Sequence, residues 1–124
     1  MNYKDLDALH SLKPNADWTW IGFEYSGLTW LDNSQTKPTE SEINNEIKRL
    51  NDAEPMRLLR VERDKKLASC DWIVTKNKEL GTNIPAAWKT YRQALRDLPA
   101  SASPKLNSEY ELDLTSVTWP TEPS

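Results

Sequence analysis

Residues 88–99 read WKTYRQALRDLP, and this stretch decides the second half of the fold. Its apolar and aromatic positions recur at steps of three and four residues: Trp88, Tyr91 or Arg92, and Leu95. Residues at these steps share one face of a helix. Pro99 is predicted to close the helix, because proline has no amide hydrogen to donate. The pattern therefore predicts a helix that ends at about residue 98 and has one apolar face.

The preceding segment carries a second apolar face. From residue 56 to about residue 77 the pattern is again helical, and its apolar side holds Leu59, Leu67, Cys70 and Ile73 or Val74. The GTNIP sequence that follows predicts a loop, and its proline is suited to open the next helix. The two segments therefore predict a helical hairpin, in which one set of side chains faces the other: Leu67, Cys70 and Ile73 against Trp88, Tyr91 and Leu95.

The amino-terminal part predicts a Trp-rich β-hairpin. Residues 16–32 read ADWTWIGFEYSGLTWLD, rich in aromatic residues and interrupted by two glycines. Alternation places Trp18 and Trp20 on one face of a first strand, and Leu28 and Trp30 on one face of a second. The residues around positions 23–26 would turn between them. An isolated hairpin is marginally stable in water, so we expect its aromatic face to be covered.

Two helices are predicted beside this hairpin. Residues 5–13 place three leucines at spacings that suit one helix face: Leu6, Leu9 and Leu12. Thr39 and Glu42 form a capping-box pattern that starts the second helix. Its apolar stripe would cover the hairpin: Ile43, Ile47 and Leu50. Pro55 leaves two alternatives, because the helix either ends near Ala53 or gives way to a new helix with Pro55 in its first turn.

After Pro99 the composition changes to ASASPKLNSEYELDLTSVTWPTEPS. This tail has no helical period, contains three prolines, and alternates weakly like a strand over YELDLTSVTW. We predict an extended arm that packs on the helical hairpin or on a partner. The fold class is therefore α+β, in three segments: a hairpin-plus-helix module at 1–54, a helical hairpin at 55–99, and an extended Pro-containing arm at 100–124.

Size and composition narrow the function. A chain of 124 residues fits one compact domain or a small domain with extended arms. Its net charge of -3 argues against general nucleic-acid binding, which depends on clustered Lys and Arg. It contains no apolar run long enough to span a membrane and no apolar core of a signal peptide, so we expect a cytoplasmic protein. Cys70 is the only cysteine and His10 the only histidine. We therefore expect no disulfide, no metal, no cofactor and no enzymatic activity.

The six tryptophans point instead to binding. Tryptophan supplies a large contact area with one polar group, and it is enriched at protein interfaces. The candidate partner-binding residues are Trp18, Trp20, Trp30 and Trp119. Stacking of the hairpin tryptophans on sugar rings is an alternative use of the same side chains, which would make the chain a receptor- or glycan-binding module. Packing in the core of the hairpin is the structural alternative to both.

Two motifs carry a resemblance to a known family. RVERDKKLASCDWIVTKN at residues 60–77, followed by PAAWKTYRQALRDLPA at residues 85–100, resembles the carboxy-terminal domain of phage tail assembly chaperone proteins. The closing VTWPTEP is similar to the extended tail that follows that domain. The amino-terminal part also resembles short modules of phage tail and tail-fibre accessory proteins.

The resemblance assigns a motif to the helical hairpin: Asp71, Trp72, Trp88, Tyr91, Arg92, Leu95, Arg96, Asp97, Leu98 and Pro99. We expect these residues to act as a scaffold, with aromatic side chains locking the two helices and an Arg–carboxylate pair tying them together. The family implies partners among phage tail or tail-fibre proteins and action in the host cytoplasm during assembly. It leaves open a homo- or hetero-oligomer in the tail, and a small structural subunit of the virion tail in place of a chaperone.

Overall fold

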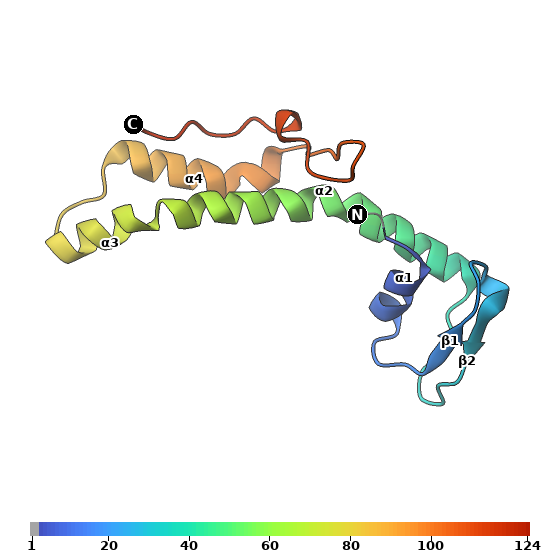
Figure 1. The fold of residues 1–124 in the computed structure, drawn as a ribbon. Coiled ribbons are helices and arrows are strands. Elements are labelled where there is room, and N and C mark those ends of the chain that lie inside the picture. Colours follow the sequence, from blue (N-terminus) through green and yellow to red (C-terminus); the bar gives the residue numbers. More distant parts are fainter. Residues whose placement is uncertain (1–2) are drawn as a thin grey trace. The chain divides into compact units, whose positions relative to one another are not determined.

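The computed structural model describes residues 3–124, and the chain divides into two compact units, residues 1–53 and 54–124 (Figure 1). The elements follow in this order: α1 (Asp5–Leu12), β1 (Trp18–Trp20), the 3-10 turn η1 (Tyr25–Gly27), β2 (Leu28–Trp30), α2 (Glu40–Ser69), α3 (Asp71–Leu80), α4 (Ala86–Ser101) and the 3-10 turn η2 (Leu114–Ser116). The α+β prediction is confirmed, since an antiparallel hairpin near the amino terminus is followed by helices.

The two strands pair as the alternation predicts. Trp18 lies opposite Trp30, and Trp20 lies opposite Leu28, in antiparallel register. The turn between them is closed by the amide of Ile21, which donates to the carbonyl of Gly27 at 3.0 Å. A Cβ atom at position 27 would lie 1.8 Å from the Ile21 carbonyl oxygen, so this position accepts only glycine.

The core of the first unit lies between the hairpin and two helices. Its buried residues are Ala8, Leu9, Leu28 and Ile43, and the half-buried residues packed against them are Leu12, Trp18, Trp20, Tyr25, Trp30 and Ile47. The predicted cover by α2 is therefore confirmed for Ile43 and Ile47, but Leu50 is not part of this core. One detail of α1 was wrong, because Leu6 is 49% exposed and Ala8 takes the inward position beside Leu9.

Helix α2 begins with the predicted capping box. The amide of Glu42 donates to the Thr39 hydroxyl at 3.1 Å, and the amide of Thr39 donates to the Glu42 carboxylate at 3.2 Å. Both alternatives for Pro55 were wrong, since α2 runs through it without a break. Proline removes only one hydrogen bond of the helix. Packing secures α2 on each side of this missing hydrogen bond, through Ile43 in the first unit and Leu59 in the second.

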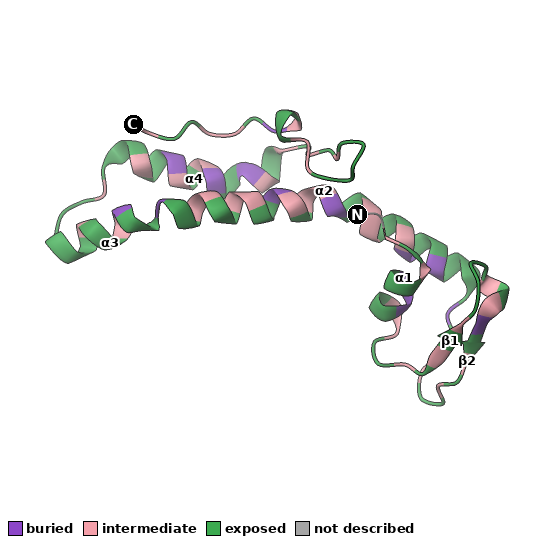
Figure 2. Cartoon of the chain, in the orientation of Figure 1, coloured by how far each residue is buried: buried purple, intermediate pink, exposed green. Residues whose placement is uncertain are grey.

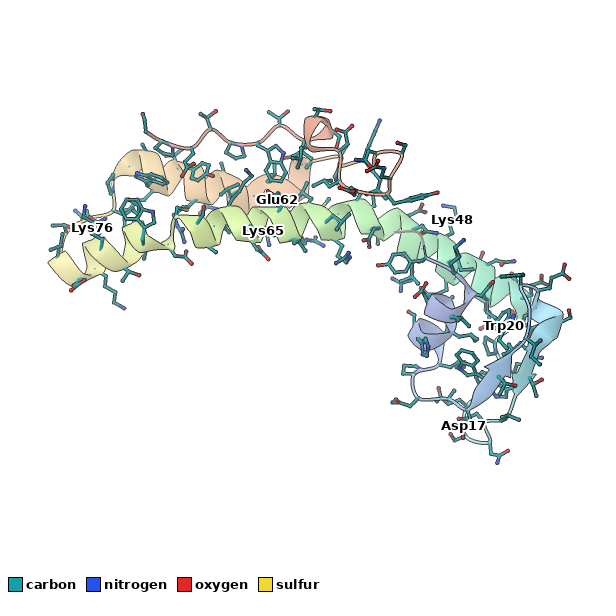
Figure 3. The ribbon with its side chains drawn as sticks, viewed as in Figure 1. Asp17, Trp20, Lys48, Glu62, Lys65 and Lys76 are labelled. Carbon is teal, nitrogen blue, oxygen red and sulfur yellow. The ribbon has the colours of Figure 1, made fainter. Side chains whose placement is uncertain are left out.

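In the second unit, α4 runs beside the carboxy-terminal half of α2, and the arm returns along α4 (Figure 1). Two clusters of buried residues join these segments, as Figure 2 shows by the purple bands on α2 and α4: Leu59, Leu98 and Val117 in one, and Cys70, Tyr91 and Leu95 in the other. Charged side chains such as Glu62 and Lys65 project from α2 (Figure 3). The predicted packing of the helical hairpin is confirmed for Leu67 and Cys70 against Trp88, Tyr91 and Leu95, whereas Ile73 is buried outside this cluster.

Two local predictions in this unit were wrong. The helix predicted over residues 56–77 breaks at Cys70, which has the non-helical dihedral angles φ -116° and ψ 12°. Helix α4 continues past Pro99 to Ser101, because a proline in the last turn removes a single amide donor. Residues 102–124 form the predicted extended arm, and the weak alternation over YELDLTSVTW gives no regular strand. They form an isolated bridge between Leu106 and Leu112 and the turn η2.

Candidate functional site

The break between α2 and α3 is held by Arg92, which reaches across from α4. Its Nη1 donates to the carbonyl of Leu67 at 3.1 Å and contacts the Sγ of Cys70 at 3.0 Å. Its Nη2 donates to Oδ1 of Asp71 at 3.0 Å. The Arg92 side chain is only 14% exposed. A single guanidinium thus joins the last turn of α2, the break itself and the first residue of α3.

The electrostatics of this contact favour a charged guanidinium. Burial by itself would lower the pKa of Arg92, but the hydrogen bonds to Cys70 and Asp71 outweigh that effect and raise the pKa above its ordinary value. The Cys70 thiol is fully buried and also contacts the carbonyl of Lys66 at 3.4 Å. Cys70 is therefore more than a small apolar residue, because it accepts a contact from a buried charge.

Three aromatic rings extend the contact along the helical hairpin. Trp72 and Trp88 meet edge to face with centroids 6.2 Å apart, and Trp88 meets Tyr91 in the same way at 5.9 Å. Tyr91 is buried, and burial, together with the nearby Glu122, raises its pKa. Trp72 is 54% exposed, so one part of this stack faces solvent.

The structure brings together only part of the family motif. Leu98 lies in the other buried cluster, with Leu59 and Val117, and Arg96 is exposed on α4, where it donates to the Gln93 side chain at 2.9 Å. Leu95 is fully buried in the same cluster as Tyr91. Asp97 is exposed and accepts a hydrogen bond from the Gln93 side chain at 2.9 Å, on the outer side of α4. Pro99 is half-buried in the last turn of that helix.

The arm packs on the helical hairpin, which is the first of the two predicted alternatives. Val117 is buried against Leu59 and Leu98. Trp119 packs against both buried clusters, and the ammonium group of Lys66 lies 5.1 Å from the centre of its ring. Its indole nitrogen donates to the carbonyl of Leu114 at 3.2 Å. Trp119 thus anchors the arm and keeps part of its surface accessible.

The hairpin tryptophans are only partly accessible. Trp18, Trp20 and Trp30 are half-buried, and all three pack on the core of the first unit. The indole nitrogen of Trp30 also donates to the carbonyl of Gln35 at 2.9 Å. The turn beyond them is far more exposed, with 81% of Ile21 and 97% of Phe23 in contact with solvent.

Sequence reasoning missed the exposure of the turn. Ile21 and Phe23 flank Gly22, which has φ +84°. Apolar residues beside a turn glycine were the sequence signal from which their exposure could have been predicted. Sequence reasoning also missed the Arg92 contact with Cys70 and Leu67. The motif included Arg92 but not Cys70, and nothing in the sequence indicated which carbonyl the guanidinium would reach.

The loop after β2 is organised by one carboxylate. Asp32 accepts hydrogen bonds from the backbone amides of Asp17, Gln35 and Ser34, and these bonds lower its pKa from 3.8 to about 2. Across residues 3–124, no group of three or more His, Cys, Asp or Glu side chains is placed to hold a metal ion. None of the helices in that range combines the length and apolar composition needed to cross a membrane.

Comparison with known proteins identifies the family. The model of the phage tail assembly chaperone protein family matches residues 56–124, which include α3, α4 and the arm. Searches of curated proteins and of solved structures find no match. Since the match covers more than half of the chain, the protein belongs to the phage tail assembly chaperone family, which points to a non-enzymatic role in tail assembly and to interaction with phage tail proteins.

Proposed function

We propose that this protein is an assembly chaperone that binds a tail or tail-fibre component in the host cytoplasm and is released before the virion is complete. The observation that carries the proposal is the family match over the helical hairpin and the arm. Its action is binding. It covers an apolar surface or an open strand edge of a tail protein until that surface meets its place in the particle.

The two units have different tasks in this proposal. The helical hairpin is the scaffold, because the Arg92 contacts and the buried clusters hold α2, α3 and α4 together. The contacts with the partner come from the β-hairpin unit and from the arm. Their tryptophans supply contact area: Trp18, Trp20, Trp30 and Trp119. All four are half-buried, so each is positioned by packing and presents its remaining surface in a defined orientation.

The alternative of a glycan-binding module has less support. A sugar ring stacks on an open aromatic face, whereas the three hairpin tryptophans lie against the core of Ala8, Leu9 and Ile43. A permanent subunit of the virion tail uses the same surfaces as a chaperone, and it differs from one only in whether the contact is released. Stoichiometry in the finished particle separates these two roles.

The test combines a gene deletion with quantitative mass spectrometry in the source phage. Deletion should stop tail assembly, and a plasmid copy of the gene should restore it. The chain should be abundant in infected cells and missing from purified virions. If virions contain the chain in a copy number that is a fixed multiple of that of a tail protein, the chain is a structural subunit and the chaperone proposal is wrong. Normal tails in the deletion strain would overturn both.

A further inference from the structure

The turn of the β-hairpin exposes the large apolar side chain of Phe23 to solvent, and hydrogen bonds constrain the backbone that carries it. Phe23 is 97% exposed, although the residues around it are tightly constrained. The Gly27 amide donates to the Glu24 carbonyl at 2.9 Å, and the Tyr25 hydroxyl donates to the Pro38 carbonyl at 2.7 Å. Exposed aromatic side chains on rigid backbone lose little conformational freedom when they bind a partner. The turn therefore has the properties of an interface anchor.

Phe23 also borders two hollows in the first unit. The larger has a volume of about 650 Å³, and Trp20 and Ile43 are among its lining residues. The smaller has a volume of about 260 Å³ and is lined in part by Leu6 and Trp20. Leu6 is 49% exposed, so apolar surface continues from the turn toward α1. A partner side chain that enters either hollow would contact Phe23 directly.

Carboxylates dominate the charge around these hollows. Asp5, Glu24 and Glu40 line the larger one, and none of them makes an ion pair with a described residue. Lys4, in the smaller hollow, is the one cation among the described residues that line the pair. By contrast, Asp52 and Glu46 elsewhere in the unit form ion pairs with Lys48 and Arg49.

The charge of the whole unit has the same sign. Its first 53 residues contain nine Asp and Glu against five Lys and Arg, although the complete chain has a net charge of only -3. The negative potential is thus concentrated in the unit that carries the exposed turn. Such a field accelerates association with basic partners and disfavours acidic ones.

We infer that this hairpin-tip surface, formed by Leu6, Trp20 and Phe23 with the carboxylates of Asp5, Glu24 and Glu40, docks an extended segment of a tail protein in which a large apolar side chain lies next to Lys or Arg. The inference rests on the proposed function and names the chemistry of the partner. The apolar side chain packs on Phe23 and enters a hollow. The neighbouring cation meets the unpaired carboxylates, which select against acidic segments.

The test uses the purified full-length chain and an array of short overlapping peptides that cover the tail and tail-fibre proteins of the source phage. Peptides that bind are measured again in solution by fluorescence polarisation. Two variants remove the two parts of the surface: Phe23→Ala, and the double substitution Glu24→Lys with Glu40→Lys. All three side chains are exposed, so these variants should fold normally.

Matched controls lie outside the surface. Leu80→Ala removes an apolar side chain that is 63% exposed on α3. Asp17→Lys reverses an exposed charge of the same unit. Asp17 directly precedes β1 and Trp20 ends it, and Figure 3 marks the two residues at opposite ends of the strand. These controls separate the loss of a specific contact from the loss of apolar surface or negative charge in general.

We expect the bound peptides to combine large apolar residues with Lys or Arg. Phe23→Ala should weaken their binding about 30-fold, the effect of losing one interface anchor. The double charge reversal should reduce the association rate and its dependence on salt, while both controls bind like the wild type. Tip variants that bind like the wild type, or bound peptides that are acidic, would overturn the inference.

Two further outcomes of these experiments would overturn the inference. If no peptide binds, the inference is overturned, because peptides reproduce the extended segment that it requires. Self-association that Phe23→Ala abolishes, measured by analytical ultracentrifugation, would show that the occupant is a second copy of this chain and would overturn it as well. The deletion strain tests the proposed function separately. If the deletion strain has defective tails and the Phe23→Ala gene restores them fully, the proposed function stands and the inference about the hairpin tip is overturned.

Discussion

Replacing Arg92 with methionine tests whether this side chain holds the break between α2 and α3. Methionine keeps most of the apolar length of the arginine stem, but it removes every hydrogen-bond donor. The substitution would therefore cancel the contacts with the Leu67 carbonyl, the Cys70 sulfur and the Asp71 carboxylate and leave the packing of α4 largely intact. The expected result is a less stable second unit with an unchanged first unit.

The magnitude follows from the three contacts. A hydrogen bond from a buried charged group contributes about 1.5–3 kcal/mol, and the bond to the Leu67 carbonyl is of this kind. That carbonyl keeps other partners, because the Cys70 amide donates to it at 3.2 Å and the Cys70 thiol at 3.4 Å. Asp71 has a side chain that is 63% exposed, so solvent screens the ion pair and its contribution is below about 1 kcal/mol. We expect Arg92→Met to lower the free energy of unfolding by about 2 kcal/mol.

The assay is hydrogen exchange with mass spectrometry under native conditions, because it reports the opening of each unit separately. Peptides that cover the end of α2 and the start of α3 should exchange faster in Arg92→Met, and peptides from the β-hairpin should not change. Asp71→Asn is the matched variant, and it should produce less than half of the effect. If the two variants accelerate exchange equally, the exposed ion pair rather than the backbone contact holds the break. Exchange at the wild-type rate in Arg92→Met would refute the role of Arg92 altogether.

Three further substitutions test other parts of the structure. Gly27→Ala should unfold the β-hairpin, because the new methyl group would lie 1.8 Å from the carbonyl oxygen of Ile21; near-ultraviolet circular dichroism would show the loss of ordered aromatic rings. Asp32 has its pKa lowered from 3.8 to about 2, so it stabilises the fold above pH 3.8 and loses this effect as the pH falls toward 2. Asp32→Asn should therefore be less stable than the wild type at neutral pH, with a difference that shrinks over that range in thermal unfolding. Trp119→Ala should cost about 2 kcal/mol and make the arm sensitive to limited proteolysis, and a resistant arm would count against its anchoring by this residue.

The elements that the sequence predicts well are those whose signals are local. The alternation around Trp18 and Trp30 predicts the strands and their facing sides, because side chains of a strand alternate with a period of two residues. The capping pair Thr39 and Glu42 marks the start of α2 within one turn. The aromatic repeat through Tyr91 predicts the inner face of α4, since a helix brings residues three and four apart together.

The candidate site was predictable only in part. The motif pointed correctly to an arginine and a carboxylate that join the helices, and the structure identifies them as Arg92 and Asp71. The tryptophans were singled out by their number, whereas the exposure of Phe23 depends on the conformation of a turn. Composition records how many aromatic residues a chain has, and it contains no information on which of them the core has room to cover.

The sequence by itself determined the α+β class, the paired strands, the capped start of α2 and the apolar faces that meet in the helical hairpin, because each depends on contacts between near neighbours in the chain. Only the tertiary structure decided that the long helix breaks at Cys70 and continues through Pro55. The residues around Cys70 include no glycine or proline, and the break is held by Arg92, which lies 22 residues further on. The gap at Pro55 is tolerated because packing secures α2 on each side of it. Contacts between distant residues outweigh local preference at both positions.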